Sequence, residues 1–154
     1  MSDLDKTGPG PAPTVGRMKV LFVSSFAPIT TDPAASQRLY RDVLGLPLDG
    51  DGDYVFTEKL AGVKHFGVWP LTDAAQACFG TAEWPADIPV PQASLEFDVD
   101  DVPAAAAELV AAGHRLLHEA RTEPWGQTVA RVLSPEGIIL GVGYSPWMHE
   151  ASNA

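Results

Sequence analysis

The chain has 154 residues, 45% of them hydrophobic, and a formal net charge of -10 at pH 7. This length allows one domain with a core, or two small halves that share one. A surface this acidic repels phosphate backbones, so nucleic acid is not an expected partner. Cys78 is the only cysteine, which excludes an intrachain disulfide and a thiolate metal cluster.

The first residues indicate a disordered tail over 1–16, because they are rich in glycine and proline and poor in apolar side chains. The first apolar run, residues 20–26, is far too short to span a membrane. No signal peptide is evident. We therefore expect a cytoplasmic protein with no membrane partner.

The first half, residues 17–80, begins with a buried strand at 19–29 that is rich in valine, leucine, phenylalanine and isoleucine. Asp32 and Pro33 have the chemistry of a helix start, and Gly45 that of a helix end. Two strands follow at 53–60 and 63–71, and then a short helix at 72–79. Prolines in residues 81–92 predict a linker.

The pattern restarts in the second half, residues 93–147. A strand is expected at 93–99, a helix that opens at Asp100 and Asp101, and a strand at 115–122. The last two strands form a hairpin around the turn at 134–137. Residues 148–154 are expected to be a second tail.

A strand, a helix and three strands thus occur twice, which indicates an internal duplication. Neither half can cover its own sheet. The fold class predicted is α+β, with two tandem βαβββ modules forming a curved mixed sheet around a central cavity. Cavities at such junctions commonly bind small organic molecules.

Three stretches resemble the vicinal oxygen chelate superfamily, which includes glyoxalase I, extradiol dioxygenases, fosfomycin-resistance enzymes and bleomycin-resistance proteins. Residues 32–46 end in Leu-Tyr-Arg-Asp-Val-Leu-Gly-Leu, similar to the family's "FYRDVLGL". Residues 96–102 resemble the start of its second module. Residues 124–126, followed by 134–137, resemble its "PWG … DPDG" hairpin. The resemblance implies the fold. It does not imply one function, because members of the superfamily catalyse many different reactions.

The family's metalloenzymes bind a divalent ion through side chains at positions that the resemblance transfers to Ser25, Ser94 and Gly141. Serine hydroxyls are poor ligands for such ions, and glycine offers none. The resemblance therefore implies a metal-free protein without a cofactor, comparable to members that sequester antibiotics. The alternative is a metal-dependent lyase, isomerase or dioxygenase with an atypical ligand set, such as His65 with Glu96. A third hypothesis is a module that binds a partner protein.

Strand alternation identifies the side chains expected to face the cavity. Glu96 lies mid-strand among apolar neighbours, so it needs a partner: a cationic ligand, a proton to abstract, or Arg131 or Lys64. His65 and Trp69 share one face of their strand. The expected ligand-binding residues are Glu96, His65, Trp69, Trp125, Gln127, Arg131, Ser94 and Gly141. Family resemblance also implies a homodimer.

Overall fold

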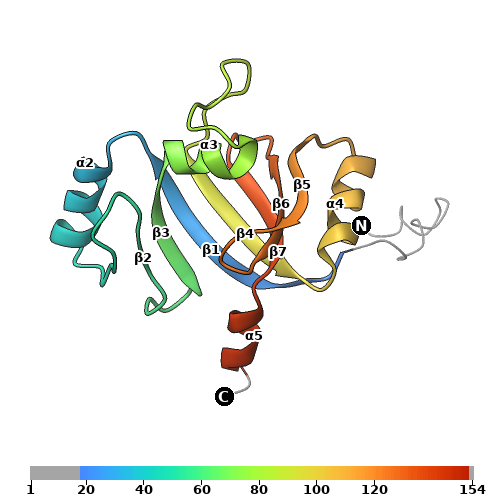
Figure 1. The fold of residues 1–154 in the computed structure, drawn as a ribbon. Helices are drawn as coiled ribbons and strands as arrows, with labels where there is room; N and C mark the ends of the chain where they lie inside the picture. Colours follow the sequence, from blue (N-terminus) through green and yellow to red (C-terminus); the bar gives the residue numbers. More distant parts are fainter. Residues whose placement is uncertain (1–17, 153–154) are drawn as a thin grey trace, which may run out of the picture.

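Seven strands form one curved sheet in the computed structural model, which describes residues 18–152 (Figure 1). The strands are β1 Val20–Thr30, β2 Val55–Thr57, β3 His65–Pro70, β4 Ala93–Val99, β5 Leu116–Thr122, β6 Thr128–Leu133 and β7 Ile139–Tyr144. Their order across the sheet is β2-β3-β1-β4-β7-β6-β5. The first strands of the two halves, β1 and β4, pair antiparallel at the centre, which joins the halves edge to edge.

The helices lie on both faces of this sheet (Figure 1). They are α2 Pro33–Gln37, which continues into the π-helix η1 Arg38–Val43, then α3 Leu71–Phe79, α4 Val102–Ala111 and α5 Pro146–Ser152. None of the helices within residues 18–152 is long and apolar enough to cross a bilayer.

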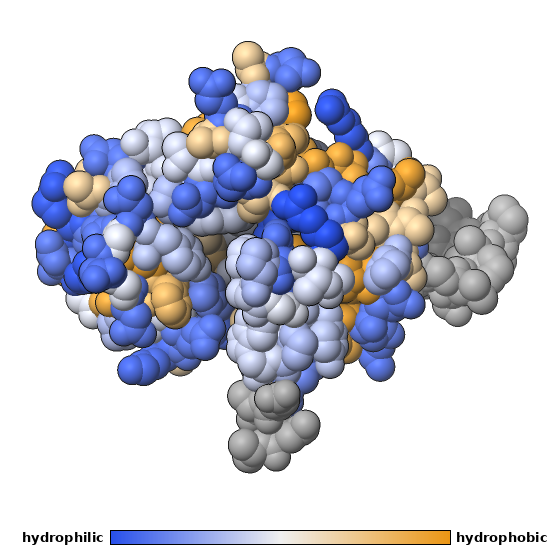
Figure 2. All heavy atoms as spheres, in the orientation of Figure 1, coloured by the Kyte–Doolittle hydropathy of each residue, from blue (hydrophilic) through white to orange (hydrophobic). Residues whose placement is uncertain are grey.

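Two hydrophobic clusters hold α2–η1 and α4 against the convex face. Tyr40 of η1 packs on a buried group that includes Val55, Phe66 and Val68. Ala105 of α4 packs on a second group that includes Val142. Helix α3 lies on the opposite, concave face, where its small buried residues contact the sheet near β7. The concave face between α3 and α5 is left open, and the space-filling surface is hollowed there, below α3 and beside α5 (Figure 2).

The predicted α+β class and curved mixed sheet are confirmed, with one difference in the first half. Only β2 and β3 follow its helix there, and residues 71–79 form α3 where the second half has a third strand. The sheet consequently has three strands from the first half and four from the second.

The tail expected at 1–16 lies outside the described residues, as do residues 153 and 154 of the tail expected from residue 148. The expectation of a tail is wrong for residues 148–152, which belong to α5. Met148 is buried. His149 places its Nε2 2.8 Å from Oδ2 of the buried Asp98, and its ring stacks on Tyr144 at 4.2 Å. A buried carboxylate is costly without polar partners, so the contact between His149 and Asp98 helps to hold α5 on the sheet.

The start of α4 offers a direct test of the capping argument. The Asp101 side chain accepts a hydrogen bond of 3.0 Å from the Ala104 N–H. We expect Asp101→Ala to lower the free energy of unfolding by about 1 kcal/mol, measured by urea denaturation. The neighbouring exposed Asp100 does not cap the helix, so Asp100→Ala serves as the control. Equal effects of the two substitutions would contradict the assignment.

Candidate functional site

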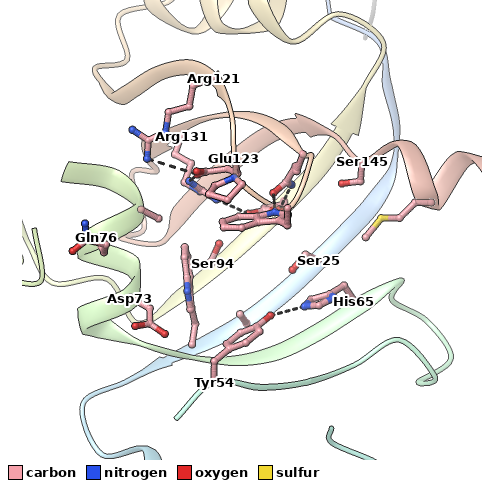
Figure 3. Close-up of a pocket in the computed structure, with 18 of the residues that line it drawn as sticks. Ser25, Tyr54, His65, Asp73, Gln76, Ser94, Arg121, Glu123, Arg131 and Ser145 are labelled. Atoms are coloured by element: carbon pink, nitrogen blue, oxygen red, sulfur yellow. Dashed lines mark hydrogen bonds and ion pairs between the residues drawn. The ribbon is translucent and has the colours of Figure 1, made fainter. Parts of the chain in front are cut away.

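A pocket of about 560 Å³ lies on the concave face, between the two halves. Figure 3 shows Tyr54 and His65 on one wall, Arg131 and Glu123 on the other, and Ser25 and Ser94 between them. Its lining includes Ser25, Ala27, Tyr54, His65, Trp69, Asp73, Gln76, Ala77, Ser94, Glu96, Arg121, Glu123, Pro124, Trp125, Gln127, Arg131, Ser145, Trp147 and Met148. Three tryptophans and one tyrosine among them give the pocket aromatic walls.

The sheet register places the central residues of this site in one row. Ser25 of β1 pairs with His65 of β3 on one side and with Glu96 of β4 on the other. Glu96 pairs in turn with Gly141 of β7, and Gly141 with Arg131 of β6. Paired residues on neighbouring strands point to the same face of a sheet. The row therefore crosses the floor of the pocket from one half to the other.

Glu96 is a buried carboxylate with two partners. Its Oε1 accepts a hydrogen bond of 2.8 Å from Gln127 Nε2, and its Oε2 lies 3.5 Å from the Arg131 guanidinium. The Trp125 indole N–H donates to Gln127 Oε1 at 3.0 Å. The exposed ring of Trp125 is thereby tied to the carboxylate on the floor. An ionised carboxylate has about four acceptor positions, so Glu96 retains capacity for a ligand.

Arg131 is 1% exposed and is the centre of a second group of contacts. One of its terminal nitrogens lies 3.0 Å from both Glu123 Oε2 and His118 Nε2. Its guanidinium carbon also lies 5.4 Å from the centre of the Trp69 ring, within the range of a cation–π interaction. A buried cation needs this many partners to offset its loss of water.

The turn between β5 and β6 positions this wall. The Glu123 N–H donates to the Gln127 carbonyl at 2.7 Å, and the Gly126 N–H donates to the Glu123 carbonyl at 2.8 Å. Gly126 has φ +98°, a left-handed conformation that glycine adopts without strain. The tight turn at residues 124–126 thus places the Glu123 carboxylate and the Gln127 amide on the same side of the pocket.

His118 of β5 is neutral in this arrangement. Its Nδ1 lies 2.7 Å from the Glu119 carbonyl and must donate, so its Nε2 accepts from Arg131. Burial lowers the pKa of His118 from 6.5 to about 4, opposed by the Glu119 carbonyl and assisted by the Arg131 charge. An uncharged imidazole beside Arg131 avoids repulsion between two cations.

The opposite wall has a chain of three polar side chains. The Tyr54 hydroxyl lies 2.6 Å from His65 Nε2, and His65 Nδ1 lies 3.1 Å from Glu58 Oε2. Burial, followed by the Glu96 charge, raises the pKa of Tyr54 well above its ordinary value, so the phenol stays protonated. This chain and the Arg131 group face each other across the pocket.

Seven of the eight predicted site residues line the pocket, and Gly141 does not. A Cβ at Gly141 would lie 2.8 Å from Glu96 Cγ, so the missing side chain makes room for Glu96 rather than for a ligand. Several partners were considered for Glu96, and pairing with Arg131 is the one that the structure contains, at 3.5 Å. Tyr54, Asp73 and Glu123 are among the lining residues that were not predicted from the sequence. Glu123 could have been found from its place directly before the Pro-Trp-Gly corner.

The positions implied for a metal do not fit a divalent ion. Ser25 and Ser94 line the pocket with hydroxyls, and Gly141 has no side chain. Glu96 contributes a single carboxylate, which is already bound to Gln127 and Arg131. No group of three or more histidine, cysteine, aspartate or glutamate side chains within residues 18–152 is arranged to hold a metal ion.

The fold and the site define a class: a small α+β protein whose two halves line a ligand-sized cavity. The profile of the Glyoxalase/Bleomycin resistance protein/Dioxygenase superfamily matches residues 23–142. The chain belongs to this superfamily. None of the curated protein sequences compared with the chain is significantly similar to it.

Solved structures share this fold at low sequence identity. An extradiol ring-cleaving dioxygenase from B. fuscum is 20% identical with a TM-score of 0.57, and the alignment covers 88% of this chain and 35% of that enzyme. A superfamily member from Vibrio splendidus 12B01 is 16% identical with a TM-score of 0.51, covering 83% of this chain and 99% of that protein. The chain therefore spans about a third of the dioxygenase. At these identities the likeness extends to the fold alone.

Proposed function

We propose that this protein binds a small organic molecule in the pocket between its halves, without a metal ion. The single observation behind the proposal is the aromatic-walled cavity of about 560 Å³ with the buried Glu96 carboxylate on its floor. Pockets of this size bury most of a drug-sized ligand, and a few polar groups fix its orientation. Sequestration of a drug or metabolite is the specific form of this function that we favour.

The lining favours a flat ligand with a positive charge or several hydrogen-bond donors. Trp69 and Trp125 offer ring faces, and Glu96 and Asp73 offer carboxylate oxygens. The lining arginines already face acidic partners, since Arg131 lies near Glu96 and Glu123 and Arg121 near Glu123. The lining therefore has more carboxylate oxygens that can accept from a ligand than cationic groups that are free to donate to one.

A binding experiment tests the proposal. A panel of planar aromatic amines and guanidines, each with an uncharged analogue of the same shape, is screened by thermal unfolding and then by calorimetry. We expect cations to raise the unfolding temperature more than their analogues do. Trp125→Leu should weaken the best binder by about 2- to 10-fold through loss of ring contact. The Trp125 side chain is 53% exposed, so the variant should remain folded.

Val43→Ala is the control, because Val43 is also exposed but lies on η1, outside the pocket lining. Equal loss of affinity in both variants would place the ligand elsewhere. Stoichiometric binding of manganese, iron, cobalt or nickel that depends on His65 and Glu96 would instead support a metal-dependent enzyme. We further propose a homodimer, which light scattering of the purified protein would test.

A further inference from the structure

Tyr54, His65 and Glu58 form a hydrogen-bonded chain that begins in the pocket and ends at the protein surface. Tyr54 and His65 line the pocket, whereas the Glu58 side chain is 47% exposed. Holding a ligand by ring contact and charge requires no such connection to solvent. The chain therefore has a chemical capacity beyond the binding function proposed above.

The position of the Tyr54 hydroxyl is built into the sheet. Tyr54 crosses Gly67 of β3, where a Cβ would lie 2.7 Å from the hydroxyl oxygen and 3.0 Å from the ring. Its ring is within 15° of parallel to the Phe56 ring and within 12° of the His65 ring. Glycine inside a strand weakens the strand, and it often marks a place where another group comes close to the backbone. Gly67 thus allows the phenol to reach the imidazole at 2.6 Å.

The proton positions in this chain follow from the partners. An ionised Glu58 carboxylate only accepts, so His65 Nδ1 donates to it and Nε2 is left as the acceptor. Tyr54 therefore donates its hydroxyl proton to Nε2. The remaining lone pairs of the Tyr54 oxygen are available as acceptors at the pocket wall. A histidine oriented by a carboxylate and bonded to a hydroxyl is an arrangement suited to moving protons.

We propose that this chain withdraws the proton of a bound ligand that has an acidic hydroxyl group, a phenol or an enol. The inference rests on the proposed function, because it places that ligand in the same pocket. The ligand O–H bond breaks, and its proton joins the Tyr54 oxygen. The Tyr54 O–H bond breaks in the same step, and that proton joins His65 Nε2. The ligand becomes an anion and His65 a cation, so the net charge of the site is unchanged.

The surrounding charges limit which ligands qualify. Tyr54 faces the carboxylates of Glu96, Glu58 and Asp73, which oppose a new anion. The imidazolium formed at His65, held by Glu58, offsets that repulsion locally. Imidazole is a weaker base than phenolate, so the hydroxyl must be more acidic than that of tyrosine. Enols flanked by carbonyl groups and phenols with electron-withdrawing substituents meet this requirement.

The probe is 4-nitrophenol, whose anion absorbs visible light. Equilibrium dialysis measures its binding, and absorbance across a pH series measures its ionisation when bound. We expect the wild-type protein to bind the probe and to lower its apparent pKa by about one unit, a tenfold gain in ionised fraction at low pH. Tyr54→Phe and His65→Gln should each abolish that shift.

Two further variants separate the relay from general damage to the pocket. Gly67→Ala keeps the Tyr54 hydroxyl but displaces it, so it should also lose the shift. Tyr40→Phe removes a hydroxyl from η1, outside the pocket lining, and should behave as wild type.

A wild-type protein that binds the probe without ionising it would overturn the relay and leave the binding function intact. A shift that persists in His65→Gln would also overturn it. Failure to bind the probe at all overturns the relay too, whereas the panel of aromatic cations decides the binding function separately.

Discussion

Replacement of Arg131 by methionine is expected to lower the free energy of unfolding by about 3 to 5 kcal/mol. The side chain is 1% exposed and lies 3.5 Å from a Glu96 oxygen and 3.0 Å from a Glu123 oxygen. Both carboxylates are buried. Methionine matches much of the apolar volume but leaves the buried Glu96 without a cation, and Glu123 with only the exposed Arg121. Urea denaturation, compared with wild type at the same pH, measures the loss.

Arg121→Met is the matched control, because Arg121 also lies near Glu123, at 3.7 Å, but its side chain is 40% exposed. An exposed ion pair contributes about 0 to 1 kcal/mol, so this variant should stay close to wild type. Adding Glu123→Gln to Arg131→Met should recover part of the lost stability, since one of the two buried negative charges is removed. If the two arginine variants were equally stable, the buried contacts of Arg131 would not be a major source of stability.

The elements of this fold were predictable where local chemistry determines them. Asp32 and Asp101 start their helices through their own side chains, as the sequence predicted. Alternation located the strand at 93–99, and the strand predicted at 115–122 begins one residue later, at Leu116. Helix α5 was not predicted, because contacts with the sheet hold it in place. His149 contacts Asp98 of β4, which is distant in the sequence, and stacks on Tyr144 of β7.

The sequence predicted which side chains of a strand face the pocket, but it did not predict the contacts between them. Parity on the strands correctly placed Glu96, His65 and Arg131 on the pocket side. Gly141 was wrong as a lining residue, because a neighbouring side chain, that of Glu96, fills the space above it. Tyr54 was missed since its role depends on pairing between β2 and β3, which brings its ring over Gly67.

The acid sensitivity of the protein is expected to depend strongly on His118. Burial lowers the pKa of His118 from 6.5 to about 4, so the unfolded chain binds this proton more readily than the folded protein does. Stability is therefore lost as the pH falls from about 6.5 towards 4, and this term is constant above and below that window. The loss at about pH 5 amounts to at most about 2 kcal/mol, and less where solvent reaches the ring.

His118→Gln should remove most of this pH dependence, because glutamine does not titrate and its amide oxygen can still accept from Arg131. The measurement is the urea midpoint of both proteins near neutral pH and near pH 5. His114→Gln, in the loop that precedes β5, changes a histidine without touching Arg131 and should retain the wild-type dependence. A steeper acid loss in His118→Gln than in wild type would show that the imidazole is charged in the folded protein. Arg131 would then face a second cation across 3.0 Å, which its two buried carboxylates would have to balance.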